Sequence, residues 1–283
     1  MGKEDRKLNF KYLAYFLIFF LFIALLFKLK NGLFNRDVKF IMLGPIVFGR
    51  LMGIGLLLSI FSIDSKYKNI IALSFLFGVL LSFSKGPILS LSLVFLLYLF
   101  LNKKIKSLLF LSVFIFLIYL NINSVINYFI SFDIPSLSRI LNVIYVLVNG
   151  GDVTNGSNYG SIGSRSDMYK ATINLIQLHP LGVGVGLWSN YISIEGLKYP
   201  HNLFLEVFSE LGVFLGVLFL IPFLLFLLVR KNNQMLFLIC MFLLFNQMVS
   251  GSIADARYLL FFSVVSAFLC WNDRGTNKGI NKG

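Results

Sequence analysis

The residues that could carry chemistry in this chain are a few cations, one imidazole and two carboxylates near the ends of apolar runs. Arg50 lies in the segment Gly44–Leu51, well inside a long apolar run. Ionisable groups at membrane depth are costly, so each is a functional candidate. The planar guanidinium of Arg50 could grip a phosphate through two parallel hydrogen bonds. The alternative interpretation is an Arg50 side chain that extends to the lipid headgroups.

Arg165 and His201 flank a second group of candidate residues. Arg165 opens a predicted helix, Ser164–Leu178, and the free N–H groups of a helix start attract anions. His201 lies in Tyr199–Asn202, just before an apolar run, and His is the side chain most easily tuned to exchange a proton near neutral pH. Together they predict an anion site with a base. The alternatives are a solvated Arg165 and an interfacial His201 without chemistry.

Two carboxylates follow His201 on one helical face. Glu206 and Glu210 are four residues apart and are expected to be shallowly buried. Either could orient a basic group or bind a sugar hydroxyl, and the alternative is a carboxylate near the headgroups. His179 is interpreted as structural, and the two cysteines as apolar packing residues. The sequence contains no zinc spacing, Ser-His-Asp set or nucleotide phosphate loop, so we expect no metal, cofactor or ATP.

The composition requires a membrane setting for these residues. Of 283 residues, 58% are hydrophobic and only 13% are charged, whereas soluble domains are about a quarter charged. The apolar runs lack the alternation of barrel strands, so spanning helices are expected. The net charge of +13 lies mostly at the ends of these runs. That placement excludes a nucleic-acid binder and leaves a role in attracting a phosphate-bearing substrate.

Eight membrane spans are predicted from runs of about twenty apolar residues. The basic N-terminus lacks a small-residue cleavage site after it, so the first run is expected to be a retained helix. Ser84–Pro87 is expected to be a tight turn, since Gly and Pro both break helices. The predicted spans are Tyr12–Phe27, Phe40–Ile63, Asn69–Ser84, Pro87–Leu101, Ser107–Ile122, Leu203–Val229, Met235–Val249 and Tyr258–Trp271.

Basic residues in the short connections predict that both termini are cytoplasmic. Three basic clusters are separated by even numbers of spans, so they share one side with the basic termini. These clusters are Lys66 with Lys68, Lys103 with Lys104 and Lys106, and Arg230 with Lys231. Four further cations fall on the opposite side without an explanation from orientation: Lys28, Lys30, Arg36 and Lys39.

The connection 123–200 is then extracytoplasmic, within a single membrane domain 1–283. Long connections of this kind tend to carry function. Its first part, Ile126–Val148, is expected to lie along the membrane surface. Gly150–Gly160 is expected to be a flexible stretch, and Gly182–Gly186 a flexible turn that returns the chain from the loop helix toward His201.

The order of these elements resembles the membrane domain shared by O-antigen ligases and O-antigen or capsular polysaccharide polymerases. The family pattern is an Arg that opens a loop helix, a His-Pro-Leu-Gly-Val-Gly turn, a His-Asn that begins a span, and Glu-Leu-Gly within it. A Ser-Arg-Gly turn lies upstream, with Lys85 in place of Arg here. The matching positions are Arg165, His179–Gly184, His201-Asn202, Glu210-Leu211-Gly212, Ser84–Pro87 and Gly44–Arg50.

The resemblance implies an all-α, GT-C-like membrane glycosyltransferase that needs no metal and uses a glycan on polyprenyl pyrophosphate. Arg50 and Arg165 would hold the pyrophosphate, and His201 would act near the acceptor hydroxyl. Asn202, Glu206 and Glu210 would support the site. Family members usually have ten or more spans, so the eight predicted here imply a short member, a truncated product or a misplaced start.

The predicted function is a polysaccharide polymerase that uses undecaprenyl-pyrophosphate-linked repeat units at the outer face of the cytoplasmic membrane. One alternative is an O-antigen ligase that transfers the glycan to lipid A-core, and another is a transporter or flippase of the same lipid-linked oligosaccharide. The absence of an inverted repeat favours an enzyme over a transporter. The expected partners are this substrate, membrane lipid and a chain-length regulator, with no nucleic acid.

Overall fold

The computed structural model describes residues 10–33, 39–41, 43–131, 141, 160–192, 198–229 and 233–280. Within these residues the chain is helical, and an isolated bridge between Phe40 and Leu43 is its only β pairing. The helices are α1 (Lys11–Asn31), α2 (Pro45–Ser62), α3 (Lys68–Leu81), α4 (Lys85–Leu101), α5 (Ile105–Leu120), α6 (Ile122–Ile130), α8 (Gly160–Leu178), α9 (Trp188–Tyr191), α10 (Leu203–Leu224), η1 (Leu225–Val229), α11 (Gln234–Ser250), η2 (Ala254–Ala256) and α12 (Arg257–Ile280).

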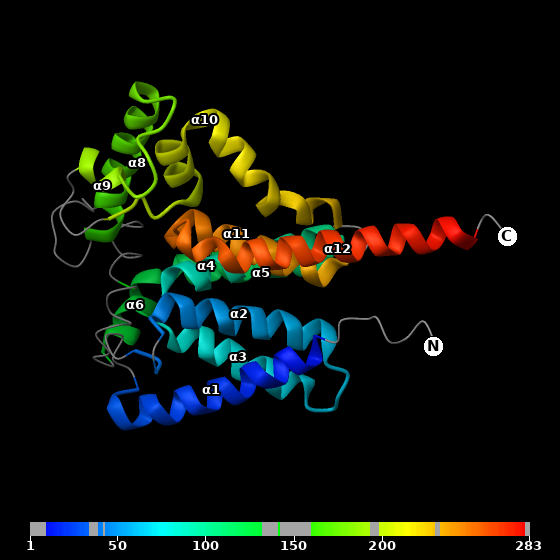
Figure 1. Cartoon of the computed structure of the whole chain (residues 1–283). Helices are drawn as coiled ribbons and strands as arrows, with labels where there is room; N and C mark the ends of the chain where they lie inside the picture. Colours follow the sequence, from blue (N-terminus) through cyan, green and yellow to red (C-terminus); the bar gives the residue numbers. More distant parts are fainter. Residues whose placement is uncertain are drawn as a thin grey trace. The chain divides into compact units, whose positions relative to one another are not determined.

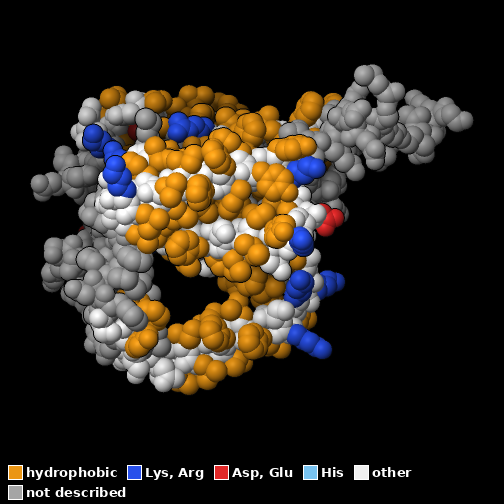
Figure 2. Space-filling view, turned by 90° about the horizontal axis from the view of Figure 1, so that it is seen from below, with side chains coloured by type: hydrophobic (Ala, Val, Ile, Leu, Met, Phe, Trp, Pro, Cys, Tyr) orange, Lys and Arg blue, Asp and Glu red, His pale blue; other side chains and the backbone are white. Residues whose placement is uncertain are grey.

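All eight predicted spans are helices, so the prediction of an all-α polytopic membrane protein is confirmed. Among the described residues, four helical segments are long and apolar enough to cross a membrane: Lys11–Asn31, Pro45–Ser62, Leu203–Leu227 and Ala254–Trp271. The other four, α3, α4, α5 and α11, are shorter apolar helices. Hydrophobic side chains cover much of the face seen in Figure 2, as expected for a surface that meets lipid.

The predicted turn at Ser84–Pro87 is wrong in its position. The chain turns at Ser82–Ser84, where Phe83 takes a left-handed φ of 46°. Helix α4 already begins at Lys85, so Gly86 and Pro87 stand in its first turn. Proline is tolerated there, because the first N–H groups of a helix have no intrahelical partner in any case.

The predicted start of the loop helix is also wrong. Helix α8 begins at Gly160, so Ser164 is not its N-cap and Arg165 stands inside the helix. The pairing of Ser164 with Asp167 is a weak capping signal, and continuing the helix through the preceding residues competes with it. The other end is confirmed, since α8 ends at Leu178, directly before His179 and Pro180.

Two predicted parts of the long connection lie mostly outside the described residues. Helix α6 forms the start of the segment Ile126–Val148, and most of the rest is not described. The same holds for Gly150–Gly160, of which only the last residue belongs to a described helix. The surface placement of the first segment and the flexibility of the second therefore stay predictions.

The chain divides into two compact units, Met1–Phe95 (unit 1) and Leu96–Gly283 (unit 2). In unit 1, α1, α2 and α3 pack side by side (Figure 1). Small residues allow the close approach of α2 and α3, because a Cβ on Gly55 would overlap the ring of Phe75. In unit 2, α10 and α12 pack together, α8 packs against α10, and α11 packs mainly against α12.

Cysteine labelling should place Asn155 outside the membrane and Lys104 inside it. The basic connections predict this orientation through their preference for the cytoplasmic side. Single Asn155→Cys and Lys104→Cys variants in intact cells should react with an impermeant maleimide only at position 155. Cys240 and Cys270 are buried and should label slowly. Labelling at 104 but not at 155 would reverse the orientation.

Candidate functional site

The turn after α8 meets α10 backbone against backbone, within unit 2. The amide of Gly184 donates to the carbonyl of Glu210 at 2.9 Å. Further on, the amide of Val213 donates to the carbonyl of Pro180 at 3.0 Å. Gly212 takes φ 80°, which breaks α10 and divides it into the two diverging segments seen in Figure 1. A turn is present at the predicted glycines, but these hydrogen bonds fix it to α10, so its predicted flexibility is not supported.

Gly212→Ala should destabilise the fold strongly, by about 2 kcal/mol or more. A Cβ there would lie 2.6 Å from the carbonyl oxygen of Leu181, and φ 80° is unfavourable for alanine. Gly186→Ala is the matched control, since Gly186 has φ 76° but nothing within 4 Å of a Cβ. Thermal unfolding in detergent should show a small decrease for Gly186→Ala and a much larger one for Gly212→Ala. Equal decreases would mean that the contact with Leu181 contributes nothing.

His201 stands in a strained backbone position just before α10. Its φ is 50°, a region that few residues other than glycine occupy and that is often found at functional sites. The ring lies 4.3 Å from the ring of Tyr199, between centroids. Its Nδ1 atom is buried and has no hydrogen-bond partner in the described part of the chain. Buried polar atoms are usually hydrogen-bonded, so this nitrogen is an exception that makes His201 a candidate for a functional role.

Charges of both signs act on His201. Burial lowers the pKa of its imidazole below the ordinary value of 6.5, and the positive charge of Arg165 lowers it further. The negative charge of Asp255 opposes this by raising the pKa. His201 is therefore neutral at pH 7 and able to accept a proton.

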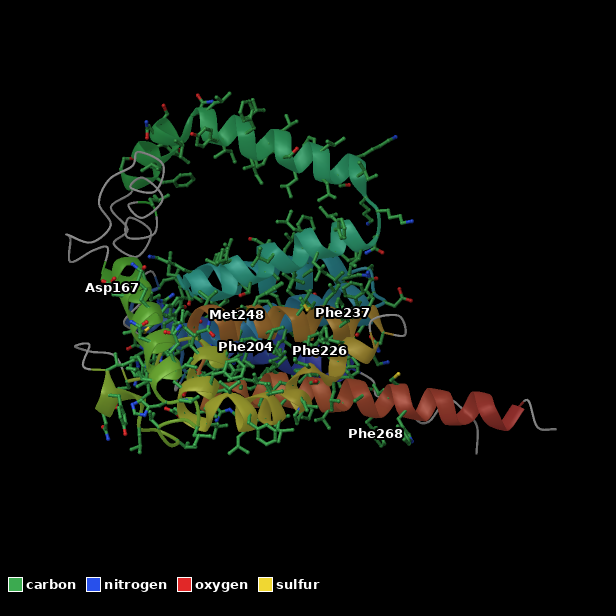
Figure 3. All side chains as sticks on the ribbon, turned by 90° about the horizontal axis from the view of Figure 1, so that it is seen from above. Asp167, Phe204, Phe226, Phe237, Met248 and Phe268 are labelled. Carbon is green, nitrogen blue, oxygen red and sulfur yellow. The ribbon has the colours of Figure 1, made fainter. Side chains whose placement is uncertain are left out.

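Asn202 fixes the start of α10 and ties it to α11. Its Oδ1 accepts from the amides of Phe204 and Leu205, at 3.0 Å and 3.2 Å, and so caps the helix. Its Nδ2 donates to the carbonyl of Met248 at 3.0 Å. Figure 3 labels Met248 near the end of α11 and Phe204 near the start of α10. These bonds fix the backbone next to His201, and a supporting role of Asn202 in the site stays a prediction.

Glu206 and Glu210 each bind a backbone amide of another segment. Glu206 Oε2 accepts from the amide of Ile253 at 3.0 Å, and Glu210 Oε2 accepts from the amide of Gly186 at 2.8 Å. Their exposed fractions are 7% and 4%, so the predicted shallow burial is wrong. The reason is that two connections fold over α10 and use these carboxylates as acceptors.

Asp255 is a site residue that the sequence analysis missed. It lies in the connection between α11 and α12. Two hydrogen bonds fix this connection: the Ile253 amide donates to Glu206, and the Gln247 side chain donates to the Asp255 carbonyl at 3.0 Å. A signal was present, since an acidic residue there interrupts two apolar runs on the predicted outer side. Arg165, His201 and Asp255 are thus brought within electrostatic reach in unit 2.

Unit 1 gathers cations around the first turns of α2. Arg50 is fully buried, and a Cβ on the adjacent Gly49 would meet Ser82, three residues before the start of α4, at 2.8 Å. The ammonium nitrogen of Lys85, at that start, is buried. Lys28 is fully buried as well, and its ammonium lies 4.6 Å from the ring centroid of Phe40. This cation–π contact accounts for the position of Lys28, one of the four cations that the predicted membrane orientation did not explain.

The burial of Arg50 is incompatible with a side chain that extends to the headgroups. Arg50→Lys should reduce glycan transfer by about tenfold or more, although the charge is kept, because the two-pronged grip is lost. The rate should be measured with purified protein and lipid-linked repeat units at saturating and limiting donor. The exposed Lys30 offers a control, since Lys30→Arg should leave the rate unchanged. A wild-type rate in Arg50→Lys would remove Arg50 from the anion site.

The structure thus brings together two of the three principal predicted residues. Arg165 and His201 interact electrostatically in unit 2. Arg50 belongs to unit 1, with Lys28 and Lys85 at the same end of α2. A shared role for Arg50 and Arg165 stays a prediction. No group of three or more metal-binding side chains occurs in the described residues.

A comparison with protein-family models identifies the chain. The model described as O-antigen ligase matches residues 70–220, more than half of the chain. The matched region contains Arg165, His201, Asn202 and both carboxylates of α10, whereas Arg50 precedes it. No curated protein matches the sequence significantly. The chain therefore belongs to the O-antigen ligase family of multi-pass membrane proteins, and its function is of the O-antigen ligase and polymerase type.

Proposed function

We propose that the chain is a membrane glycosyltransferase that polymerises undecaprenyl-pyrophosphate-linked repeat units at the outer face of the cytoplasmic membrane. The observation that carries the proposal is His201, which has a buried Nδ1 without a partner among the described residues and faces the charge of Arg165. A neutral base beside a fixed cation suits a reaction whose donor is an anion and whose acceptor is a hydroxyl.

In the proposed reaction, the acceptor hydroxyl oxygen attacks the anomeric carbon of the donor sugar. The new C–O bond forms as the bond from that carbon to the pyrophosphate oxygen breaks. The hydroxyl proton passes to His201, and the bonding electrons leave with undecaprenyl pyrophosphate. Arg165 stabilises the negative charge that develops on this leaving group, without reorganising during the reaction.

Arg50 is proposed as a second pyrophosphate ligand because it is fully buried in α2, in a unit that also buries the cationic groups of Lys28 and Lys85. A planar guanidinium can hold a phosphate through two parallel hydrogen bonds.

The acceptor distinguishes a polymerase from a ligase, and the donor half of the reaction is common to both. A composition rich in Ile, Phe, Asn and Lys indicates an AT-rich genome and favours a capsule polymerase.

The test supplies purified protein with lipid-linked repeat unit and no second acceptor. Growth of polymer supports the proposal. Transfer only after lipid A-core is added would make the chain a ligase, and movement of the lipid-linked glycan across the bilayer without transfer would make it a flippase.

The proposed cellular setting follows from the donor. A lipid-linked sugar is available on the outer side after it has been flipped, whereas nucleotide sugars are not. Both termini are proposed to be cytoplasmic, and a chain-length regulator is a proposed partner, since polymer length must be limited by some protein contact.

A further inference from the structure

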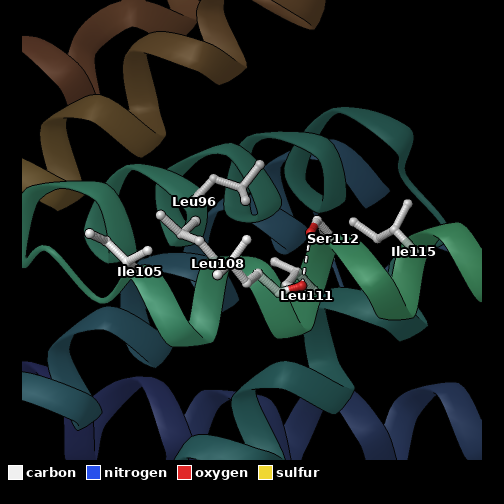
Figure 4. A pocket seen from close by; sticks show the side chains of 7 residues that line it. Leu96, Ile105, Leu108, Leu111, Ser112 and Ile115 are labelled. Atoms are coloured by element: carbon white, nitrogen blue, oxygen red, sulfur yellow. Dashed lines mark hydrogen bonds between the residues drawn. The ribbon is translucent and has the colours of Figure 1, made fainter.

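An apolar groove lies between the end of α4 and the first half of α5, within unit 2. Its volume is about 350 Å³, within the range of small-ligand sites. Leu96 lines it from α4, and Ile105, Leu108 and Ile115 line it from α5 (Figure 4).

The groove offers almost no polar surface to a ligand. Among the described residues, Ser112 is the only polar one that lines it, and the Ser112 hydroxyl donates its proton to the carbonyl of Leu109 at 2.8 Å, the dashed line in Figure 4. A ligand that fills the groove therefore gains contact mainly through hydrocarbon. An acyl chain satisfies this requirement, whereas a sugar or a peptide backbone would leave buried polar groups unpaired.

Three lysines stand at one end of the groove. Lys104 and Lys106 flank the lining residue Ile105, and Lys103 precedes them in the turn with φ 52°. All three side chains are exposed. Lys104 is held in place by Tyr98, since its ammonium donates to the Tyr98 hydroxyl at 3.3 Å and lies 5.0 Å from the ring centroid. Basic groups beside a groove between membrane helices are suited to an anionic headgroup.

We propose that this groove binds an anionic phospholipid of the surrounding bilayer, with an acyl chain along α4 and α5 and the phosphate at Lys103, Lys104 and Lys106. The charge of the lysines and the hydrocarbon lining match the two halves of such a lipid. Helix α5 has no buried residue of its own, so a bound lipid would also complete the packing of this face. The site is independent of the proposed transferase function.

Native mass spectrometry of the full chain in detergent tests the proposal, with phosphatidylglycerol and phosphatidylcholine of identical acyl chains as probes. The wild-type chain should retain one phosphatidylglycerol in preference to phosphatidylcholine. Combined Lys103, Lys104 and Lys106→Gln should weaken phosphatidylglycerol binding by tenfold or more, since each lysine near a membrane surface contributes about fivefold. Leu108→Trp, which fills the groove, should reduce the retention of both lipids.

Lys66→Gln with Lys68→Gln is the matched control. These residues form another basic connection but do not line the groove. The Lys66 ammonium lies 5.1 Å from the Tyr67 ring centroid, a contact like that of Lys104 with Tyr98 at 5.0 Å. The control should bind like the wild type. The combined Lys103, Lys104 and Lys106→Arg variant keeps the charge and should also bind like the wild type, and it can be measured if the Gln variant fails to fold. Equal binding of both lipids by the wild type, an equal loss in the control, or wild-type binding by Leu108→Trp would each overturn the proposal. A polyprenyl phosphate could instead displace phosphatidylglycerol and bind the wild type and the Gln variant equally well. That result would assign the groove to the tail of the glycan donor.

Discussion

Replacing His201 with alanine should slow glycan transfer by about 10²–10⁴-fold while the protein remains folded. The imidazole is the proposed acceptor of the proton from the attacking hydroxyl, and without it the proton must pass to water. Its Nδ1 makes no hydrogen bond within the described structure, so few native contacts are lost with it. The rate of polymer formation should be measured in liposomes with lipid-linked repeat units, and the folded fraction by thermal unfolding.

Two further variants separate chemistry from backbone strain. His201→Asn suits the φ of 50° at this position, because asparagine tolerates the left-handed region better than alanine. It should be as inactive as His201→Ala. His179→Ala changes the other histidine of the chain, which is exposed and contacts the ring of Tyr191, and should remain active. Wild-type transfer by His201→Asn would exclude His201 as the base.

Most of the fold could be predicted because hydrocarbon imposes one dominant rule on the sequence. A run of apolar residues long enough to cross the bilayer must satisfy its own backbone, and only a helix does so here. The predicted run Leu203–Val229 therefore coincides with the combined extent of α10 and η1. Helix ends outside the hydrocarbon lack this constraint. Helix α1 consequently extends past the predicted Phe27 to Asn31 and carries Lys28 into the interior.

The features that could not be predicted depend on contacts between residues far apart in the sequence. The kink at Gly212 arises because the backbone of Pro180 and Leu181 lies directly against it, and no local pattern near Gly212 indicates that contact. The burial of Glu206 likewise depends on its contact with the amide of Ile253, which lies beyond η1 and α11 in the sequence. Arg165 and His201 could be selected as candidates from the sequence, because an isolated charge or imidazole beside an apolar run is a functional candidate on its own.

Such long-range contacts also link the glycine turn after α8 to the two candidate site residues, Arg165 and His201. The Gly184 amide and the Glu210 carbonyl join the end of α8 to α10, so the position of Arg165 relative to His201 depends on that junction. A change in the turn would move the charge away from the base without removing either group. Loss of activity in a glycine variant is therefore expected even where the chain still folds.

Arg165→Gln should slow transfer by about 10²-fold and move the acidic limb of the pH profile to higher pH. The first effect follows from the loss of a fixed cation beside the leaving pyrophosphate. The second follows from the pKa of His201, which the charge of Arg165 lowers. The base must be neutral, so activity falls as the pH drops through this pKa. Removing the cation raises the pKa, and inactivation then begins at a higher pH.

The opposite shift is expected when the neighbouring negative charge is removed. Asp255 raises the pKa of His201, so Asp255→Asn should lower it and move the acidic limb to lower pH. Lys170→Gln, at an exposed position on the same helix as Arg165, should leave the profile unchanged. Values of kcat/KM should be compared from pH 4 to pH 9, because kcat/KM reports the pKa of the free enzyme, the state in which Arg165 and Asp255 act on His201. Parallel shifts in Arg165→Gln and Asp255→Asn would contradict the assignment, because charges of opposite sign cannot move the pKa of one group in the same direction.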